Sequence, residues 1–218
     1  DDDFQKSLMI VNTAGWDTDC NSGNVGCILG IKNGLEGIKQ GPDYITPVND
    51  IIYLPTAYGS ETMTDALLES QNIINITRKM NGLESKVIKN NARYNFEMET
   101  STQGWMVDKS NDNNLNTSLS NVDYKSDNGT RALQVSFNDL SFGLASEIFV
   151  DSFFPEWFTK LEGYQVQRYF HYDYVACPIV YSGQKIKTEI ISQSEKDLRI
   201  NLFIKYWGEE DKLSLIHI

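Results

Sequence analysis

Residues 14–33 read AGWDTDCNSGNVGCILGIKN. They follow one stretch that has helical periodicity and contain a second. In the second stretch, Cys20–Asn33, apolar residues recur at helical spacing, while three glycines lower the helix propensity. Glycines three and four positions apart on one face let another backbone approach closely, so we expect a tightly packed, buried helix. Gly34 can then supply the left-handed conformation that ends a helix.

Two aspartates, Asp17 and Asp19, stand where this helix begins, and free backbone N–H groups and the helix dipole favour carboxylates there. Because one residue separates them on a turn, their oxygens can point at a common centre, as Mg²⁺ or Ca²⁺ requires. The competing interpretation makes Asp19 the N-cap of the helix and Asp17 an ordinary turn residue. The Asp-Thr-Asp triplet alone does not decide between the two.

Two further stretches have the 3.6-residue period of amphipathic helices. Residues 3–13 place apolar side chains on one side, at Phe4, Leu8, Ile10 and Val11. Residues 62–80 do the same, at Met63, Leu67, Ile73, Ile74 and Ile76. For the latter we expect an N-cap at Thr62 or Ser60, a stop at Gly82 and a place at the edge of a helical bundle.

From about Asn90 onward the apolar period changes to two, which indicates half-buried strands. The clearest alternating runs are Val166–Tyr174, Lys185–Ile191 and Leu198–Trp207. Loops are expected at Ser110–Thr117 and Ser126–Thr130, which are rich in Asn, Asp, Ser and Gly. Short strands separated by such loops suggest a β-sandwich, with a domain boundary near Gly82–Asn91.

The ordered string of an amphipathic helix, Gly-Trp-Asp-Thr-Asp-Cys-Asn and a glycine-spaced helix resembles the ADP-ribosylglycohydrolase family, over about residues 1–85. The resemblance implies a hydrolase that removes ADP-ribose from an acceptor with two Mg²⁺ ions, for which Mn²⁺ could substitute. It implies that Asp19 bridges the ions and that Asp17 binds one of them. The family commonly has Thr or Ser where this chain has Cys20, a soft ligand poorly suited to Mg²⁺. Three alternatives follow: Cys20 stays out of the shell, a water or Asn21 replaces it, or the ion differs.

The remaining ligands of that family lie in N-terminal motifs, so we expect this chain to be a fragment that is inactive alone. A bacterial, metagenomic origin fits the ending Leu213–Ile218, LSLIHI, which resembles the translation of a sequencing adapter. On that interpretation His217 is not a biological residue. The cellular compartment stays open.

The second region resembles the opening of galactose-binding-like or carbohydrate-binding jelly rolls, through Asn95–Trp105 and Gly129–Val135. Aromatic side chains could stack on a glycan, although core packing is the default for large aromatics in strands. The candidates are Trp105, Tyr124, Trp157 and Tyr169. His171, without a partner at ligand spacing, is assigned no role.

Charge and composition exclude several classes of partner. The formal net charge is −11 and no stripe of Lys and Arg is present, so nucleic acid is not expected. No apolar run is long enough to span a membrane. The three cysteines, Cys20, Cys27 and Cys177, suggest neither a disulfide framework nor a zinc site.

The sequence therefore predicts an α+β chain of two domains. Residues 1–85 would be the C-terminal part of an all-α ADP-ribosylglycohydrolase-like domain, residues 90–212 a truncated antiparallel, jelly-roll-like β-sandwich, and residues 213–218 the adapter. The predicted function is that of a metal-dependent hydrolase acting on ADP-ribosylated substrates, with Asp17, Asp19 and Cys20 as candidate metal ligands. The alternative is a non-catalytic glycan-binding sandwich with a helical scaffold.

Overall fold

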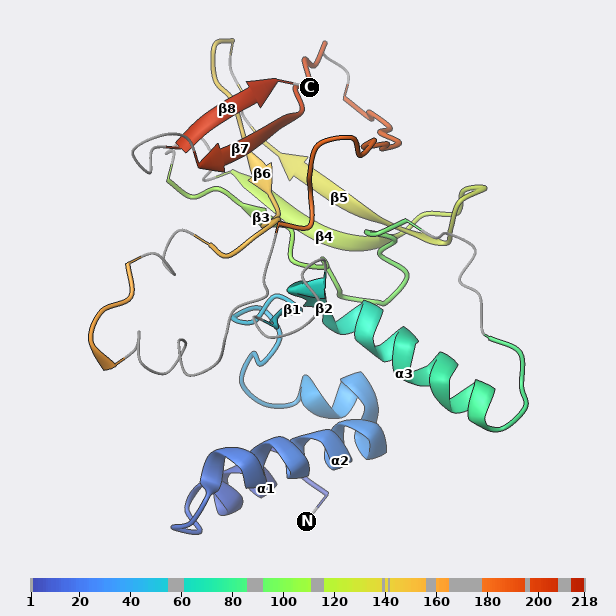
Figure 1. Ribbon diagram of the computed structural model, residues 1–218, viewed down its shortest axis with the longest axis vertical. Coiled ribbons are helices and arrows are strands. Elements are labelled where there is room, and N and C mark those ends of the chain that lie inside the picture. The colour runs from blue at the N-terminus through green and yellow to red at the C-terminus, as the bar shows by residue number, and fades with distance from the viewer. Residues whose placement is uncertain are drawn as a thin grey trace. The chain divides into compact units, whose positions relative to one another are not determined.

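A computed structural model describes residues 2–54, 61–85, 92–110, 116–138, 140, 142–155, 160–164, 178–194, 197–207 and 213–217. The chain divides into two compact units, residues 1–181 and 182–218. Within the described residues, the first unit contains α1 to α3 and β1 to β6, and the second contains β7 and β8. Figure 1 labels these elements along the chain.

The first unit begins with a helical hairpin of α1 (Phe4–Asn12) and α2 (Thr18–Ile38). Both helices agree in position with the sequence prediction. Gly26 of α2 faces α1, but an added Cβ would lie 3.6 Å from Leu8 Cδ2, which is an ordinary contact with a side chain, so the close backbone approach expected at this glycine does not occur. Gly34 has φ 66° and ψ −173°, a conformation open essentially to glycine, and it kinks α2, which continues to Ile38, rather than ending it in the predicted left-handed conformation.

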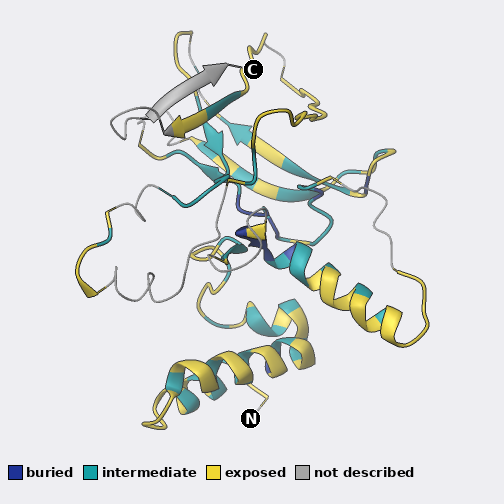
Figure 2. Cartoon of the chain, viewed as in Figure 1, coloured by how far each residue is buried: buried dark blue, intermediate teal, exposed yellow. Residues whose placement is uncertain are grey.

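The prediction that α2 is buried was wrong. Leu29 is its buried residue, while the side chains of Ile28 and Ile31 are 65% and 82% exposed. The reason is that α2 packs on one helix, α1, which covers one face and leaves the others in solvent. Figure 2 shows a mixture of exposed and intermediate residues along both helices.

The helix predicted over residues 62–80 is shorter than expected and follows a strand. Met63–Asp65 forms β2, which pairs antiparallel with β1 (Ile51–Tyr53). The helix α3 (Ala66–Met80) begins after it, with Asp65 as N-cap rather than Thr62, and Ser60 lies outside the described residues. The stop at Gly82 is confirmed, since Gly82 has φ 68°. No bundle surrounds α3 within the described chain, because α3 packs on β2.

A buried polar cluster lies where β2 meets α3, and we call Asp65, Arg93 and Gln103 the Asp65 network. The Asp65 carboxylate is 1% exposed and accepts from the Leu68 amide at 2.9 Å, from Gln103 Nε2 and from the Arg93 guanidinium. Gln103 Oε1 in turn accepts from the backbone amides of Asn95 and Phe96, both at 2.8 Å. The Asp65 network therefore joins residues on both sides of the boundary predicted at Gly82–Asn91.

The remaining strands of the first unit form small antiparallel sheets. The strand β3 (Met106–Val107) pairs with β6 (Ile148–Phe149), and β4 (Thr117–Asp123) pairs with β5 (Arg131–Phe137). The turn expected at Ser126–Thr130 is confirmed, because the Ser126 amide donates to the Gly129 carbonyl at 2.9 Å.

In the second unit, β7 (Phe203–Trp207) pairs antiparallel with β8 (Leu213–His217). The expected strand Leu198–Trp207 is therefore shorter, and Lys185–Ile191 has no strand although its residues alternate. Val166–Tyr174 lies outside the described residues. The adapter interpretation of Leu213–Ile218 stays a prediction, and residues 213–217 of that segment form β8.

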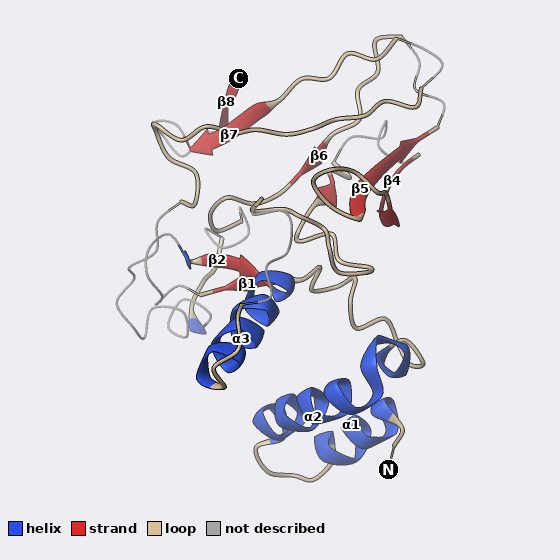
Figure 3. Ribbon diagram, turned by 90° about the vertical axis from the view of Figure 1, so that its right-hand side faces the viewer, coloured by secondary structure: helices blue, strands red, loops and turns tan. Residues whose placement is uncertain are grey.

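The predicted fold class was wrong. The described residues contain three helices and four two-stranded antiparallel sheets. This arrangement is neither an all-α ADP-ribosylglycohydrolase-like domain nor a jelly-roll sandwich. Figure 3 shows the strands as separate short pairs. The physical reason is the small apolar core, because Leu29, Met63 and Leu67 are the buried apolar residues of the described chain. Among the described residues, no helix is both long and apolar enough to cross a membrane.

Replacing Asp65 by Ala should lower the free energy of unfolding by about 3 kcal/mol. This value is at the low end of the range for breaking a buried ion pair, because the Arg93 side chain is 34% exposed and water can solvate its charge once Asp65 is gone. Three donors would lose their acceptor, including the N-terminus of α3. Urea unfolding followed by circular dichroism measures the change. Asp123→Ala is the control, since its carboxylate also pairs with an arginine but is 88% exposed. Equal losses in the two variants would contradict this role of Asp65.

Candidate metal centre at the start of helix α2

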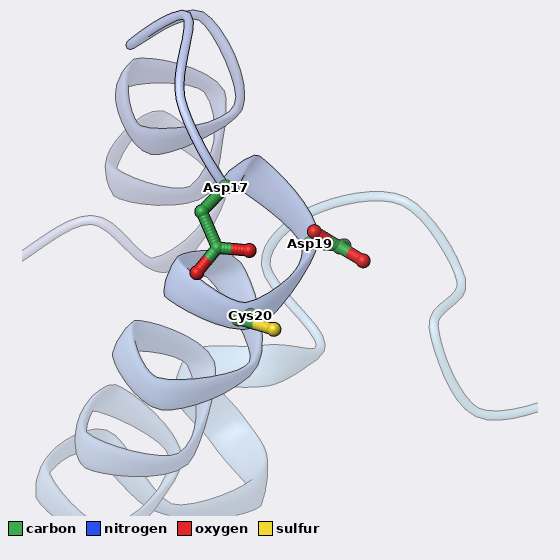
Figure 4. Close-up of side chains that lie close together, drawn as sticks. All are labelled: Asp17, Asp19 and Cys20. Carbon is green, nitrogen blue, oxygen red and sulfur yellow. The ribbon is translucent and has the colours of Figure 1, made fainter.

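The structure brings the three predicted ligands together at the first turn of α2. The three potential ligand atoms, a carboxylate oxygen each from Asp17 and Asp19 and the sulfur of Cys20, lie within 4.8 Å of one another. All three residues are exposed. Figure 4 shows the side chains on this turn, with the Asp17 carboxylate directed toward Cys20. Sequence reasoning therefore named every member of this group, which is the metal-compatible group found in the described part of the chain.

The backbone at Asp17 explains how the two carboxylates converge. Asp17 is the N-cap of α2 and has left-handed angles, φ 47° and ψ 46°, which Asp adopts more readily than most residues. Its side chain makes no capping hydrogen bond to the helix. The interpretation of Asp19 as N-cap was therefore wrong, because Asp19 lies inside the first turn.

Hydrogen bonds within the hairpin fix the loop that carries these residues. Asn21 Nδ2 donates to the Trp16 carbonyl at 3.2 Å, which ties the loop to the first turn of α2. Ser22 Oγ lies 2.5 Å from Asn12 Oδ1 and 2.5 Å from the Thr18 carbonyl, and so links the end of α1 to the start of α2. The side-chain nitrogen Nδ2 of Asn21 thus holds the loop, and the side-chain oxygen Oδ1 is the atom that could replace the Cys20 sulfur in a metal shell.

The Cys20 thiol responds to both carboxylates. A hydrogen bond with the Asp17 side chain, followed by the negative charges of Asp17 and Asp19, raises the pKa of Cys20 above its usual value. A thiol held in its neutral form is a poor ligand, because metals bind the thiolate. Cys20 therefore adds little to a hard-cation site, and the two aspartates supply its negative charge.

A second group of ionisable side chains lies near the Asp65 network. Tyr53 donates to Asp151 Oδ2 at 3.4 Å, and burial raises the pKa of Asp151 and that of Tyr53. The adjoining cavity, lined in part by Arg93 and Gln103, has a volume of about 10 Å³. This is room for about one water molecule, so the group cannot admit a substrate in this conformation.

The structure describes two of the four aromatic residues proposed as glycan platforms, and glycan binding stays a prediction. Trp105 is half-buried and packs edge-on against Tyr94 at a centroid distance of 5.6 Å, and Tyr124 is half-buried as well. Trp157, Tyr169, His171 and Cys177 lie outside the described residues. Trp16, which sequence reasoning did not single out, is 84% exposed beside Asp17.

Comparison of the chain with protein-family models, with curated proteins and with solved structures gave no match. The geometry at the start of α2 is therefore the observation on which any functional interpretation rests.

Replacing Asp17 by Asn should increase the rate at which Cys20 is alkylated near neutral pH. The Asp17 carboxylate raises the pKa of Cys20, so its removal lowers that pKa and increases the thiolate fraction. Iodoacetamide labelling at a series of pH values, read by peptide mass mapping, measures the shift. Cys27, also exposed on α2, is the internal control and should react equally in both proteins. An unchanged Cys20 profile would contradict the contact with Asp17.

Proposed function

We propose that Asp17 and Asp19 bind a divalent cation, and that the site belongs to a hydrolase that releases ADP-ribose, or a related nucleotide-ribose, from an acceptor. The proposal concerns the site at the start of α2 and does not require the all-α domain that the fold excludes. Mg²⁺ is the expected ion and Mn²⁺ a functional substitute, because both prefer carboxylate oxygens.

The observation that supports cation binding most directly is the uncapped carboxylate of Asp17. An aspartate at an N-cap ordinarily accepts a hydrogen bond from a backbone amide of the first turn, as Asp3 does in α1 and Asp65 in α3. Asp17 makes no such bond, although it occupies the same position of α2. Its carboxylate is instead directed toward Cys20 (Figure 4), and one of its oxygens lies within 4.8 Å of a ligand atom of Asp19.

The substrate class follows from the resemblance of the Gly-Trp-Asp-Thr-Asp-Cys-Asn string to the ADP-ribosylglycohydrolase family. A divalent cation held by exposed carboxylates can orient the ribose diol and activate a water molecule without a histidine base. The chain itself would contribute Asp17 and Asp19 to that work, while Ser22 and Asn21 hold the loop in position.

Two carboxylates leave most of the coordination shell of Mg²⁺ to other ligands. Mg²⁺ takes six oxygens and often keeps several waters when one or two carboxylates bind it. We therefore expect weak cation binding by this chain and no hydrolysis, with tight binding and activity in a protein that carries the remaining ligands of the family.

Titration with Mn²⁺, followed by electron paramagnetic resonance of the free ion, tests the cation site. We expect weak binding that Mg²⁺ competes away and that Asp17→Asn or Asp19→Asn reduces at least tenfold, because each removes one of two charged ligands. Asp127→Asn is the matched control, since it removes an exposed carboxylate elsewhere in the chain. Uptake that is equal in all four proteins would exclude the site.

The hydrolase part of the proposal has a separate test. A protein that carries the whole metal site should release ADP-ribose from ADP-ribosylated peptides with Mg²⁺, and its Asp19→Asn variant should lose most of that activity. Cation binding without hydrolysis would remove the ADP-ribosyl assignment while leaving the metal site in place.

A further inference from the structure

The helix α3 has a second apolar surface, on the side away from the core. At 3.6 residues per turn, Ile73, Ile76 and Met80 lie roughly 180° to 240° around the helix from the buried residue Leu67. Their side chains are 65%, 60% and 82% exposed. We call these three residues the α3 stripe. Figure 2 shows that α3 is exposed along most of its length beyond the first turn.

The spacing of the α3 stripe is that of a helix that packs against another helix. Positions i, i+3 and i+7 form one continuous row, and such rows anchor amphipathic helices to their partners. Three neighbouring large apolar side chains in water are also a larger patch than singly scattered exposed residues, which need no explanation.

The charges of α3 indicate what kind of helix fits this row. The first turn contains Glu69, whereas the last turn contains Arg78 and Lys79. The Arg78 guanidinium donates to the Glu84 carbonyl at 2.6 Å and, at about 100° per residue, lies on the Leu67 side of α3, so Lys79 is the basic residue of this turn that lies nearer the α3 stripe. A helix that is acidic at its start and basic at its end is complementary to a second copy of itself in the opposite direction.

We propose that two copies of the chain associate through their α3 stripes, with the two helices antiparallel about a two-fold axis. A crossing centred between Ile73 and Ile76 places Ile73 of one copy opposite Ile76 of the other. The same register places Glu69 opposite Met80 and next to Lys79 of the second copy. Antiparallel helices also align their dipoles favourably, and a two-fold interface satisfies both copies with one surface. Because the surface is small, the dimer is weak and depends on concentration.

Sedimentation velocity on the full chain, over a hundredfold range of concentration, tests the dimer. We expect a reversible monomer–dimer equilibrium that Ile76→Lys abolishes, because the lysine would place two charges at the centre of the interface. Ile31→Lys is the matched control, since Ile31 is 82% exposed on α2 and outside the α3 stripe. Circular dichroism checks that both variants keep their helices.

Charge reversal tests the antiparallel order. Glu69→Lys and Lys79→Glu should each weaken the dimer severalfold, and the double variant should recover it. Glu69 also accepts from the Thr64 hydroxyl at 2.6 Å. That bond is lost both in Glu69→Lys and in the double variant, so recovery of the dimer in the double variant reports on pairing between copies. A wild-type chain that stays monomeric, forms aggregates without a dimer, or dimerises equally with Ile76→Lys overturns the proposal. A double variant that fails to recover overturns the antiparallel arrangement.

Discussion

One buried carboxylate, Asp65, holds the centre of the first unit together. Asp65 ends β2, caps α3 and accepts hydrogen bonds from Arg93 and Gln103. The side-chain oxygen of Gln103 in turn accepts from the backbone amides of Asn95 and Phe96. A buried charge is costly unless every donor around it is in place, so these contacts have to form together. The described chain has few buried apolar side chains. The hydrogen bonds of Asp65 therefore help to fix β2, α3 and the segment that contains Arg93 and Gln103, which a hydrophobic core would otherwise hold together.

The order of the helical hairpin comes from local contacts. Gly26 faces Leu8 of α1, Ser22 links the two helices, and the left-handed backbone at Asp17 starts α2. Local contacts of this kind are set by neighbouring residues, which is why the positions of α1 and α2 and the group of Asp17, Asp19 and Cys20 could be predicted from the sequence. The assignment of the N-cap could not, because it depends on one dihedral angle at Asp17.

The parts of the fold that sequence patterns missed depend on contacts between distant segments. Residues 63–65 have helical periodicity but pair with β1. Asp65 ends this strand, and its partners Arg93 and Gln103 lie 28 and 38 residues later in the chain, where a local pattern cannot reveal them. The run Lys185–Ile191 alternates as a strand should, yet alternation does not supply a neighbour to pair with. The jelly-roll prediction failed for the same reason, since the period of two identifies strands and not the sheet they build.

The cation site proposed at Asp17 and Asp19 lies at the first turn of α2 and does not involve the polar centre around Asp65. Paramagnetic broadening of backbone amide signals by a trace of Mn²⁺ tests this most directly. Broadening that is strongest over residues 16–22 and weak over residues 61–68 is the predicted result. Broadening spread evenly over the acidic surface, or strongest elsewhere, would contradict it.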